Sequence, residues 1–257
     1  MKTLLSSALF VALLLSYSPT ANAQTEITLI APGGIKAPIV QLIPGFEQKT
    51  GNKVKATFGS GLGTKKQVAQ GDAFDVPVIQ PPYPEVLASG NVVAGSATPL
   101  ATVFVGVAVK QGTPKPDIST PEAVKRMLLQ AKSVSFPNAA GGAAAGVSFE
   151  ETLKKLGIAD EIQSKLKRGK GGADAMKMVA DGEVEIGLTF LSEMDEPGID
   201  VVGPLPRAIS TPTSLVGFVS AHAKDPAAAK ALLQYLSSPA AAPVYKEHGM
   251  QPGMGNQ

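Results

Sequence analysis

The order of elements along the chain limits its possible folds more than any other feature of the sequence. Short β-rich runs end in glycine-rich loops, and each loop leads into a stretch with helix-compatible apolar spacing. Glu26 to Ile30 is followed by such a stretch over 35–50, and Lys53 to Phe58 by one over 65–70. This strand–loop–helix order predicts an α/β fold with a parallel sheet covered by helices.

The alternation restarts after residue 112, which predicts a second αβ lobe. We expect one lobe from 24–103 and 213–257 and a second from 104–212, joined by crossing segments near 100–110 and 204–213. The carboxyl ends of the strands in both lobes should face one cleft. The sequence predicts one unbroken β-rich run over 100–110, further strands over 74–79, 133–136, 185–190, 199–202 and 215–220, and further helices over 121–130, 147–156, 172–180 and 226–236.

Residues 1–23 contain the three parts of a secretory signal peptide. Lys2 supplies the positive charge, Leu4 to Leu15 is an apolar run, and Ala21-Asn22-Ala23 offers small residues for cleavage. The apolar run is too short to span a bilayer, which disfavours the alternative of a short membrane anchor. We therefore expect cleavage before Gln24, export to the periplasm and no stable membrane insertion.

Composition excludes several kinds of site. The chain is 44% hydrophobic and 17% charged, which is typical of a globular protein. It has no cysteine, which excludes disulfides, thiolate metal sites and cysteine nucleophiles. His222 and His248 are the only histidines, too few for a multi-histidine metal centre, and we interpret both as surface residues. Lys+Arg total 23 against 21 Asp+Glu, so the charge pattern of a nucleic-acid-binding protein is missing.

Three glycine-rich loops follow predicted strands, at Ala31–Lys36, Gly59–Thr64 and Pro137–Gly142. None has the complete dinucleotide or P-loop motif, and any one of them alone could be a flexible turn. Together they predict backbone N–H groups at helix starts that would bind an anion. The candidate ligand-binding residues in and near these strand ends are Gly33, Gly34, Ser60, Gly61, Thr64, Lys66, Gln80, Asn138, Ala139 and Thr189.

Four side chains are candidates for acid–base chemistry, with no role assigned to any one of them. Lys36 and Lys65 would add positive charge to two of the loops, although each also fits a solvated helix face. Tyr83 follows a Pro-Pro turn, where a surface aromatic is the alternative. Glu193 belongs to an acidic run over 193–196, a pattern typical of a solvated loop.

Long parts of the sequence resemble a known family. These are GNKVKATFGSGLGTKKQVAQGDAFDVPVIQ, GGADAMKMVADGEVEIGLTFLSE and KDPAAAKALLQYLSSPAAAPVYKEHGM. In this order they resemble the periplasmic molybdate-binding proteins of bacterial ABC importers, across essentially the whole mature chain. The resemblance implies the type II periplasmic-binding-protein fold, with two αβ lobes and a ligand between them. For a carrier it also implies an ABC permease as partner.

The family's oxyanion contacts are not all present. Its first loop normally offers a serine, where this chain has Pro32-Gly33-Gly34-Ile35. Its second-lobe strand normally ends in a tyrosine, where this chain has Thr189-Phe190, although Ser60 matches the serine-rich second loop. Two lost hydroxyl donors and several nearby lysines disfavour a compact tetrahedral oxyanion. They favour a larger anion with several carboxylates.

A narrower resemblance is to the periplasmic aconitate isomerases, which share this scaffold. It implies an allylic proton shift between trans- and cis-aconitate that needs no metal or organic cofactor. The alternative is a non-catalytic importer protein that binds a small organic polycarboxylate, with molybdate or another oxyanion ranked lower. In either case we expect a monomer that binds a small organic anion and no nucleic acid.

Overall fold

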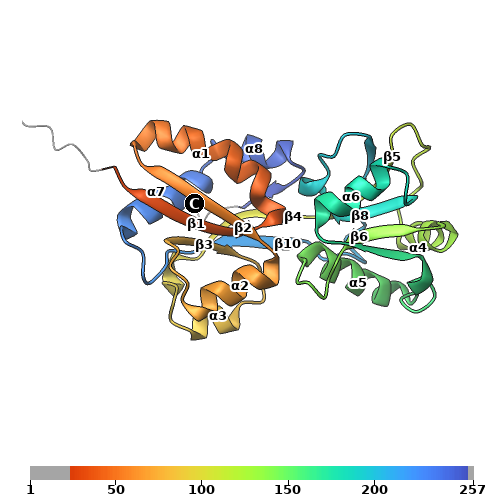
Figure 1. The fold of residues 1–257 in the computed structure, drawn as a ribbon, viewed down its shortest axis with the longest axis horizontal. Helices are drawn as coiled ribbons and strands as arrows, with labels where there is room; N and C mark the ends of the chain where they lie inside the picture. Colours follow the sequence, from red (N-terminus) through yellow and green to blue (C-terminus); the bar gives the residue numbers. More distant parts are fainter. Residues whose placement is uncertain (1–23, 254–257) are drawn as a thin grey trace, which may run out of the picture.

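The structure, a computed structural model, describes residues 24–253. Its strands form two mixed sheets that lie side by side, each with helices on both faces (Figure 1). The predicted signal peptide over 1–23 lies outside the described residues.

The first sheet has the strand order β11-β4-β10-β3-β1-β2. Strand β1 runs parallel to both β2 and β3, so these three strands end at the same edge. Strand β10 is antiparallel to β3 and β4, and β11 is antiparallel to β4. The bounds are β1 Glu26–Pro32, β2 Lys53–Gly59, β3 Val76–Ile79, β4 Thr98–Val103, β10 Thr213–Gly217 and β11 Gln251–Pro252.

The second sheet has the order β7-β6-β8-β5-β9. Here β6 runs parallel to β7 and β8, while β5 is antiparallel to β8 and β9. The parallel strands of this sheet therefore also share one edge for their carboxyl ends. The bounds are β5 Val105–Lys110, β6 Val134–Pro137, β7 Leu166–Gly169, β8 Ile186–Phe190 and β9 Ile199–Pro204.

Helices α1, α7 and α8 cover one face of the first sheet, and α2 and α3 cover the other; α6 and α5 cover opposite faces of the second (Figure 1). Several helices begin and end where local chemistry requires it. Thr120 and Asp225 cap the N-termini of α4 and α7, and Gly51 and Gly157 end α1 and α5 in the left-handed conformation. The helical bounds are η1 Gly33–Ile35, α1 Lys36–Thr50, α2 Gly61–Gln70, α3 Pro84–Ala88, η2 Ala94–Ser96, α4 Pro121–Gln130, α5 Ala144–Leu156, η3 Gln163–Lys165, α6 Gly172–Ala180, η4 Leu191–Glu193, α7 Pro226–Leu236 and α8 Ala242–Glu247.

The central strands are buried along their whole length because helices cover both faces of each sheet. All residues of β3, β6 and β8 are buried. Strand β2 lies at the edge of its sheet and alternates between exposed and half-buried residues. Continuous apolar strands flanked by helices are the usual pattern for such sheets. The rigid core thus holds the strand ends in fixed positions.

The structure confirms the α/β fold with two lobes but corrects parts of the sequence interpretation. The sheets are mixed rather than parallel, since β4, β5, β9, β10 and β11 run antiparallel to their neighbours. The run over 100–110, expected as one strand, breaks at Phe104 and contributes β4 and β5 to different sheets. Helices α4, α6 and α7 match their predicted bounds, whereas α2 and α5 begin earlier than expected. The lobe limits near 104 and 212 stay a prediction.

Over residues 24–253, no helix is long and apolar enough to cross a membrane.

Candidate functional site

The carboxyl ends of six parallel strands, three from each sheet, meet around one cavity. Its volume is about 190 Å³. The first sheet contributes the residues that end or follow β1, β2 and β3, and the second sheet those that end or follow β6, β7 and β8. The lining residues are Pro32, Gly33, Gly34, Gly59, Ser60, Gly61, Gln80, Pro137, Ala143, Ala144, Ala145, Lys170, Gly171, Gly172, Phe190, Glu193 and Leu215. This convergence makes the cavity the candidate functional site.

Helices begin at this cavity from both sides. Helix α2 follows Ser60, whose Oγ accepts a hydrogen bond from the Gly63 N–H at 3.1 Å. Helices α5 and α6 begin after Ala143 and Gly171, and neither residue provides a side-chain cap. The first N–H groups of a helix have no partner within the helix, and its N-terminus favours negative charge. The cavity is therefore suited to an anion.

Glu193 is the one residue with a carboxyl group among the described residues that line the cavity. It is half-buried at the end of η4, and its Oε2 accepts a hydrogen bond from Thr189 Oγ1 at 2.5 Å. Burial raises the pKa of this carboxyl above its ordinary value of 4.5, and nearby Asp195 raises it further. The hydrogen bonds from Thr189 and from the backbone at Phe190 oppose this shift but do not outweigh burial. The carboxyl of Glu193 therefore keeps its proton to a higher pH than an exposed glutamate does.

The carboxyl of Glu193 is held close to two glycines of the site. A Cβ added at Gly172 would lie 2.5 Å from Glu193 Oε2 and 2.7 Å from Thr189 Oγ1. A Cβ added at Gly33 would lie 3.4 Å from Glu193 Oε1. Because Gly33 belongs to the first lobe and Gly172 to the second, the carboxyl lies between the two lobes.

Comparisons with known proteins agree with this arrangement. Residues 27–251 match the family of bacterial extracellular solute-binding proteins. The chain belongs to this family. It is 33% identical to an aconitate isomerase of Pseudomonas sp. over 250 residues, which covers 94% of each protein. It is 31% identical to the molybdate-binding protein ModA of Azotobacter vinelandii over 249 residues, which covers 95% of this chain and 96% of that protein. The solved structure of the Azotobacter vinelandii periplasmic molybdate-binding protein superposes with a TM-score of 0.74 at 18% identity, covering 89% of this chain and all of the other.

Within this solute-binding fold, part of the predicted residue set gathers at the cavity. Of the candidate ligand-binding residues, Gly33, Gly34, Ser60, Gly61 and Gln80 line it. Of the acid–base candidates, Glu193 lines it. The interpretation of the acidic run as a solvated loop is wrong for Glu193, because the chain turns inward at η4. The ligand-binding and catalytic roles themselves stay predictions.

The other predicted residues lie elsewhere. Lys36 lines an adjoining hollow of about 410 Å³, and Lys65 and Ala139 line a neighbouring cavity of about 510 Å³. Thr189 reaches the site only through its hydrogen bond to Glu193. The remaining candidates are not among the residues that line the central cavity, and these are Thr64, Lys66, Tyr83 and Asn138.

Two of these displaced residues have structural roles instead. The ring of Tyr83 packs edge-on against Phe218, with ring centroids 5.5 Å apart. Asn138 organises the loop after β6, since its Oδ1 accepts from the Ala140 N–H at 3.1 Å and its carbonyl accepts from the Gly141 N–H at 3.2 Å. The loop still reaches the cavity through Pro137 and Ala143, the residues that flank it.

The sequence interpretation missed Lys170, the one cationic residue among the described residues that line the cavity. It follows β7, a short edge strand over Leu166–Gly169 whose Lys167 and Arg168 are exposed. The residues of that strand do not alternate between apolar and polar, so the sequence did not indicate a strand there or a loop at its carboxyl end. The Gly-Lys-Gly-Gly segment over 169–172 before a helix was the available signal.

The two lobes touch directly across the cavity. Ser192 Oγ donates to the Gly34 carbonyl at 2.7 Å, and the Leu62 N–H donates to the Gly142 carbonyl at 3.2 Å. Each bond joins a residue of one sheet's lobe to a residue of the other's. The structure therefore has its lobes in contact around the cavity.

Within residues 24–253, no group of three or more His, Asp or Glu side chains is arranged to hold a metal ion.

Proposed function

We propose that this chain is a periplasmic aconitate isomerase that interconverts trans- and cis-aconitate in the cavity between its lobes. Glu193 is the observation that carries the proposal. An ionised carboxyl group among the N–H donors opposes the binding of an anion, because like charges repel. A proton shift requires a general base, a role that this carboxyl group can take. The 33% identity to an aconitate isomerase over 94% of the chain supports the same function.

The reaction moves one proton and leaves the molecular formula unchanged. Glu193, as carboxylate, accepts a proton from the methylene carbon next to one terminal carboxylate. The electron pair released forms a new double bond to the central carbon, and the old double bond shifts its electrons toward the far carbon. Glu193, now protonated, then returns the proton to the far carbon, which restores its carboxylate. Burial raises the pKa of Glu193, which makes its carboxylate a stronger base than that of an exposed glutamate.

The rest of the cavity stabilises the charge that develops. During the shift the negative charge spreads onto the two terminal carboxylates. The helix starts at Ala143 and Gly171 line the cavity, and Lys170 adds a full positive charge. Donors held in place before the reaction stabilise such charge without reorganisation. No step of this mechanism requires a group from outside the chain.

Replacing Glu193 tests the proposal directly. Purified protein is mixed with trans-aconitate in D₂O, and cis-aconitate and deuterium incorporation are followed by NMR. We expect Glu193→Gln to lower kcat by about 100-fold or more, the usual contribution of a general base, while trans-aconitate still binds. Glu196→Gln is the matched control, since it removes a carboxyl from the same acidic run but does not line the cavity. Wild-type protein that binds trans-aconitate without converting it would refute the proposal.

The second candidate is a carrier that delivers a polycarboxylate to an ABC permease. Membership of the solute-binding family and the 31% identity to a molybdate-binding protein favour this role. A carrier would bind one equivalent of trans-aconitate with no product and no deuterium exchange. Tight tungstate binding with no response to tricarboxylates would instead favour an oxyanion carrier.

A further inference from the structure

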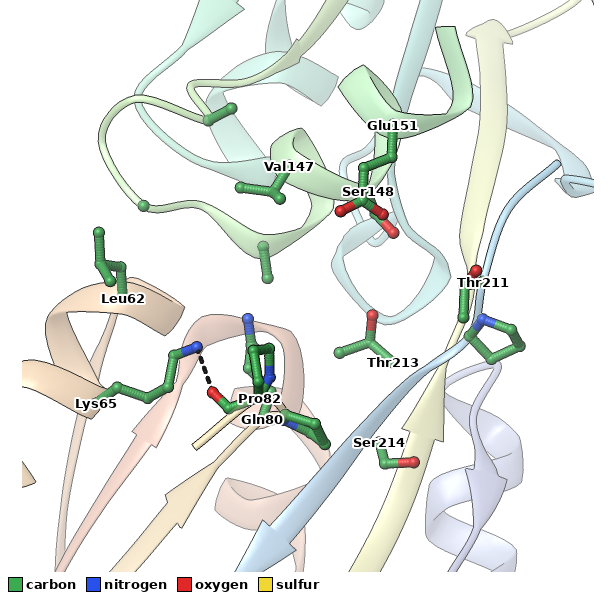
Figure 2. A pocket seen from close by; sticks show the side chains of 15 residues that line it. Leu62, Lys65, Gln80, Pro82, Val147, Ser148, Glu151, Thr211, Thr213 and Ser214 are labelled. Atoms are coloured by element: carbon green, nitrogen blue, oxygen red, sulfur yellow. Dashed lines mark hydrogen bonds between the residues drawn. The ribbon is translucent and has the colours of Figure 1, made fainter. Parts of the chain in front are cut away.

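Two cavities between the lobes share walls. The central cavity of about 190 Å³ adjoins an outer cavity of about 510 Å³, and both are lined by Gln80 and Ala144. Figure 2 shows the outer cavity, with Leu62, Lys65 and Gln80 on one side and Val147, Ser148 and Glu151 on the other. A ligand that passes Gln80 would therefore be in contact with both.

Gln80 has the features of a side chain that awaits a ligand. It follows β3 and is only 8% exposed, and its Oε1 has no hydrogen-bond partner. Its amide lies against the backbone of Gly61, where an added Cβ would lie 2.4 Å from Nε2. A buried acceptor without a partner costs about 1–3 kcal/mol, and Oε1 can be satisfied only by a donor. A bound carboxylate, which only accepts, would instead bond Gln80 through the Nε2 hydrogens.

Lys65 provides a cation on the far side of Gln80. Its Nζ donates to the Pro82 carbonyl at 3.0 Å, two residues beyond Gln80 on the same segment (Figure 2). This contact orients the ammonium group toward the outer cavity and leaves two of its three N–H groups for another acceptor. Glu151 is the one residue with a carboxyl among the described residues of this cavity, and it is exposed on α5.

The chemistry of the proton shift separates the three carboxylates of aconitate into two classes. The developing charge resides on the two outer carbons of the three-carbon unit and extends onto the terminal carboxylates. The central carbon is a node of that charge, so the central carboxylate does not take part. The two terminal groups need the N–H donors and Lys170 of the central cavity. The central group only needs to be held away from Glu193.

Resting on the proposed function, we propose that the site has two chambers. The terminal carboxylates bind in the central cavity, and the central carboxylate passes Gln80 and pairs with Lys65 in the outer cavity. Lys65 and Gln80 then determine specificity for a tricarboxylate over a dicarboxylate. Lys65 acts as a binding residue, in place of the acid–base role considered from the sequence.

The test compares trans-aconitate with trans-glutaconate, which has the same carbon unit and terminal carboxylates but no central one. Isothermal titration calorimetry measures Kd for both with the full-length mature protein. We expect Lys65→Met to weaken trans-aconitate binding about tenfold or more, as for the loss of one charge-assisted contact, with trans-glutaconate affinity within about twofold of wild type. Gln80→Leu should likewise weaken the binding of trans-aconitate more than that of trans-glutaconate. Lys49→Met, at the opposite end of α1 in the same lobe, is the control and should change neither affinity.

Equal weakening of both ligands by Lys65→Met, or no change in either, would overturn the two-chamber site. Calorimetry detects binding without turnover, so the result does not depend on the isomerase proposal. A selective loss of trans-aconitate binding in a protein that produces no cis-aconitate would support the two chambers while refuting the isomerase. If the wild-type protein produces cis-aconitate but Lys65→Met weakens the binding of both ligands equally, the isomerase is supported and the two chambers are refuted.

Discussion

A methyl group added at Gly172 should displace the carboxyl of Glu193 and the Thr189 hydroxyl that is bonded to it. The new Cβ would lie 2.5 Å from Glu193 Oε2, whereas ordinary contact begins at 3.4 Å, so the carboxyl must retreat by about 0.9 Å. A misplacement of about 1 Å at a reacting group can cost about 100-fold in rate, which corresponds to about 2.7 kcal/mol in the activation barrier. We therefore expect Gly172→Ala to lower kcat for trans-aconitate by about 100-fold.

The assay must separate positioning from binding and from folding. Initial rates over a range of trans-aconitate concentrations give kcat and KM, and we expect most of the loss in kcat. A thermal unfolding scan checks that the variant folds. Gly95→Ala is the control, because an added Cβ there meets no atom within 4 Å and lies away from the site. A folded Gly172→Ala protein with kcat within about twofold of wild type would show that the position of Glu193 does not limit the reaction.

Two further substitutions test the parts of the fold that hold the strand ends in place. Asp75 is buried and accepts hydrogen bonds from the Thr28 N–H and Oγ1, both at 2.7 Å, and from the Lys224 N–H at 2.8 Å. Burial raises the pKa of Asp75, but these hydrogen bonds outweigh burial and hold the pKa below its ordinary value of 3.8. The ionised Asp75 therefore stabilises the folded protein above pH 3.8, and this contribution is lost as the pH falls through the lowered pKa. Asp75→Asn should lower the free energy of unfolding, measured with urea at pH 7, by about 1–3 kcal/mol, and by less in acid. An equal loss of stability at both pH values would contradict this. Gly146→Ala should lower the free energy of unfolding by about 1–3 kcal/mol or more, because the added Cβ would lie 2.0 Å from the Pro137 carbonyl oxygen and push α5 away from β6. Gly95→Ala is again the control, and an equal Tm for the two variants would contradict this prediction.

Much of the fold could be predicted because the apolar periodicity and the helix signals are local. Pro121 and Pro226 at the first helical positions, after Thr120 and Asp225 as caps, fix the starts of α4 and α7 in the sequence itself. The break at Phe104 could not be predicted in this way. No glycine or proline marks it, and the switch between sheets is decided by the pairing of β4 with β10 and of β5 with β8 and β9.

The candidate site was predictable where it rests on backbone and not where it rests on long side chains. Gly33, Ser60 and Gly61 line the cavity because strand ends and helix starts fix the position of a loop. Lys65 and Lys66 are sequence neighbours of that loop, but the turn of α2 decides where each side chain points, and Lys65 reaches the Pro82 carbonyl instead of the central cavity. Glu193 could not be separated from its exposed neighbour Asp195 by sequence alone, because η4 turns Glu193 into the cavity, where it is half-buried, and leaves Asp195 at the surface.

The position of Glu193 also bears on how the proposed chemistry would be combined with anion binding. Two unit charges about 4 Å apart repel by about 4 kcal/mol in a partly buried site, so an ionised Glu193 would oppose any anion that the helix starts attract. That opposition disappears when the carboxyl holds a proton, and burial favours the protonated form. A bound anion would therefore raise the pKa of Glu193 further. For the proposed proton shift, Glu193 must instead be a carboxylate beside the bound anion, so Lys170 and the helix starts that line the cavity have to offset this repulsion. Under the proposed function, this carboxyl is the group that catalysis adds to a binding fold.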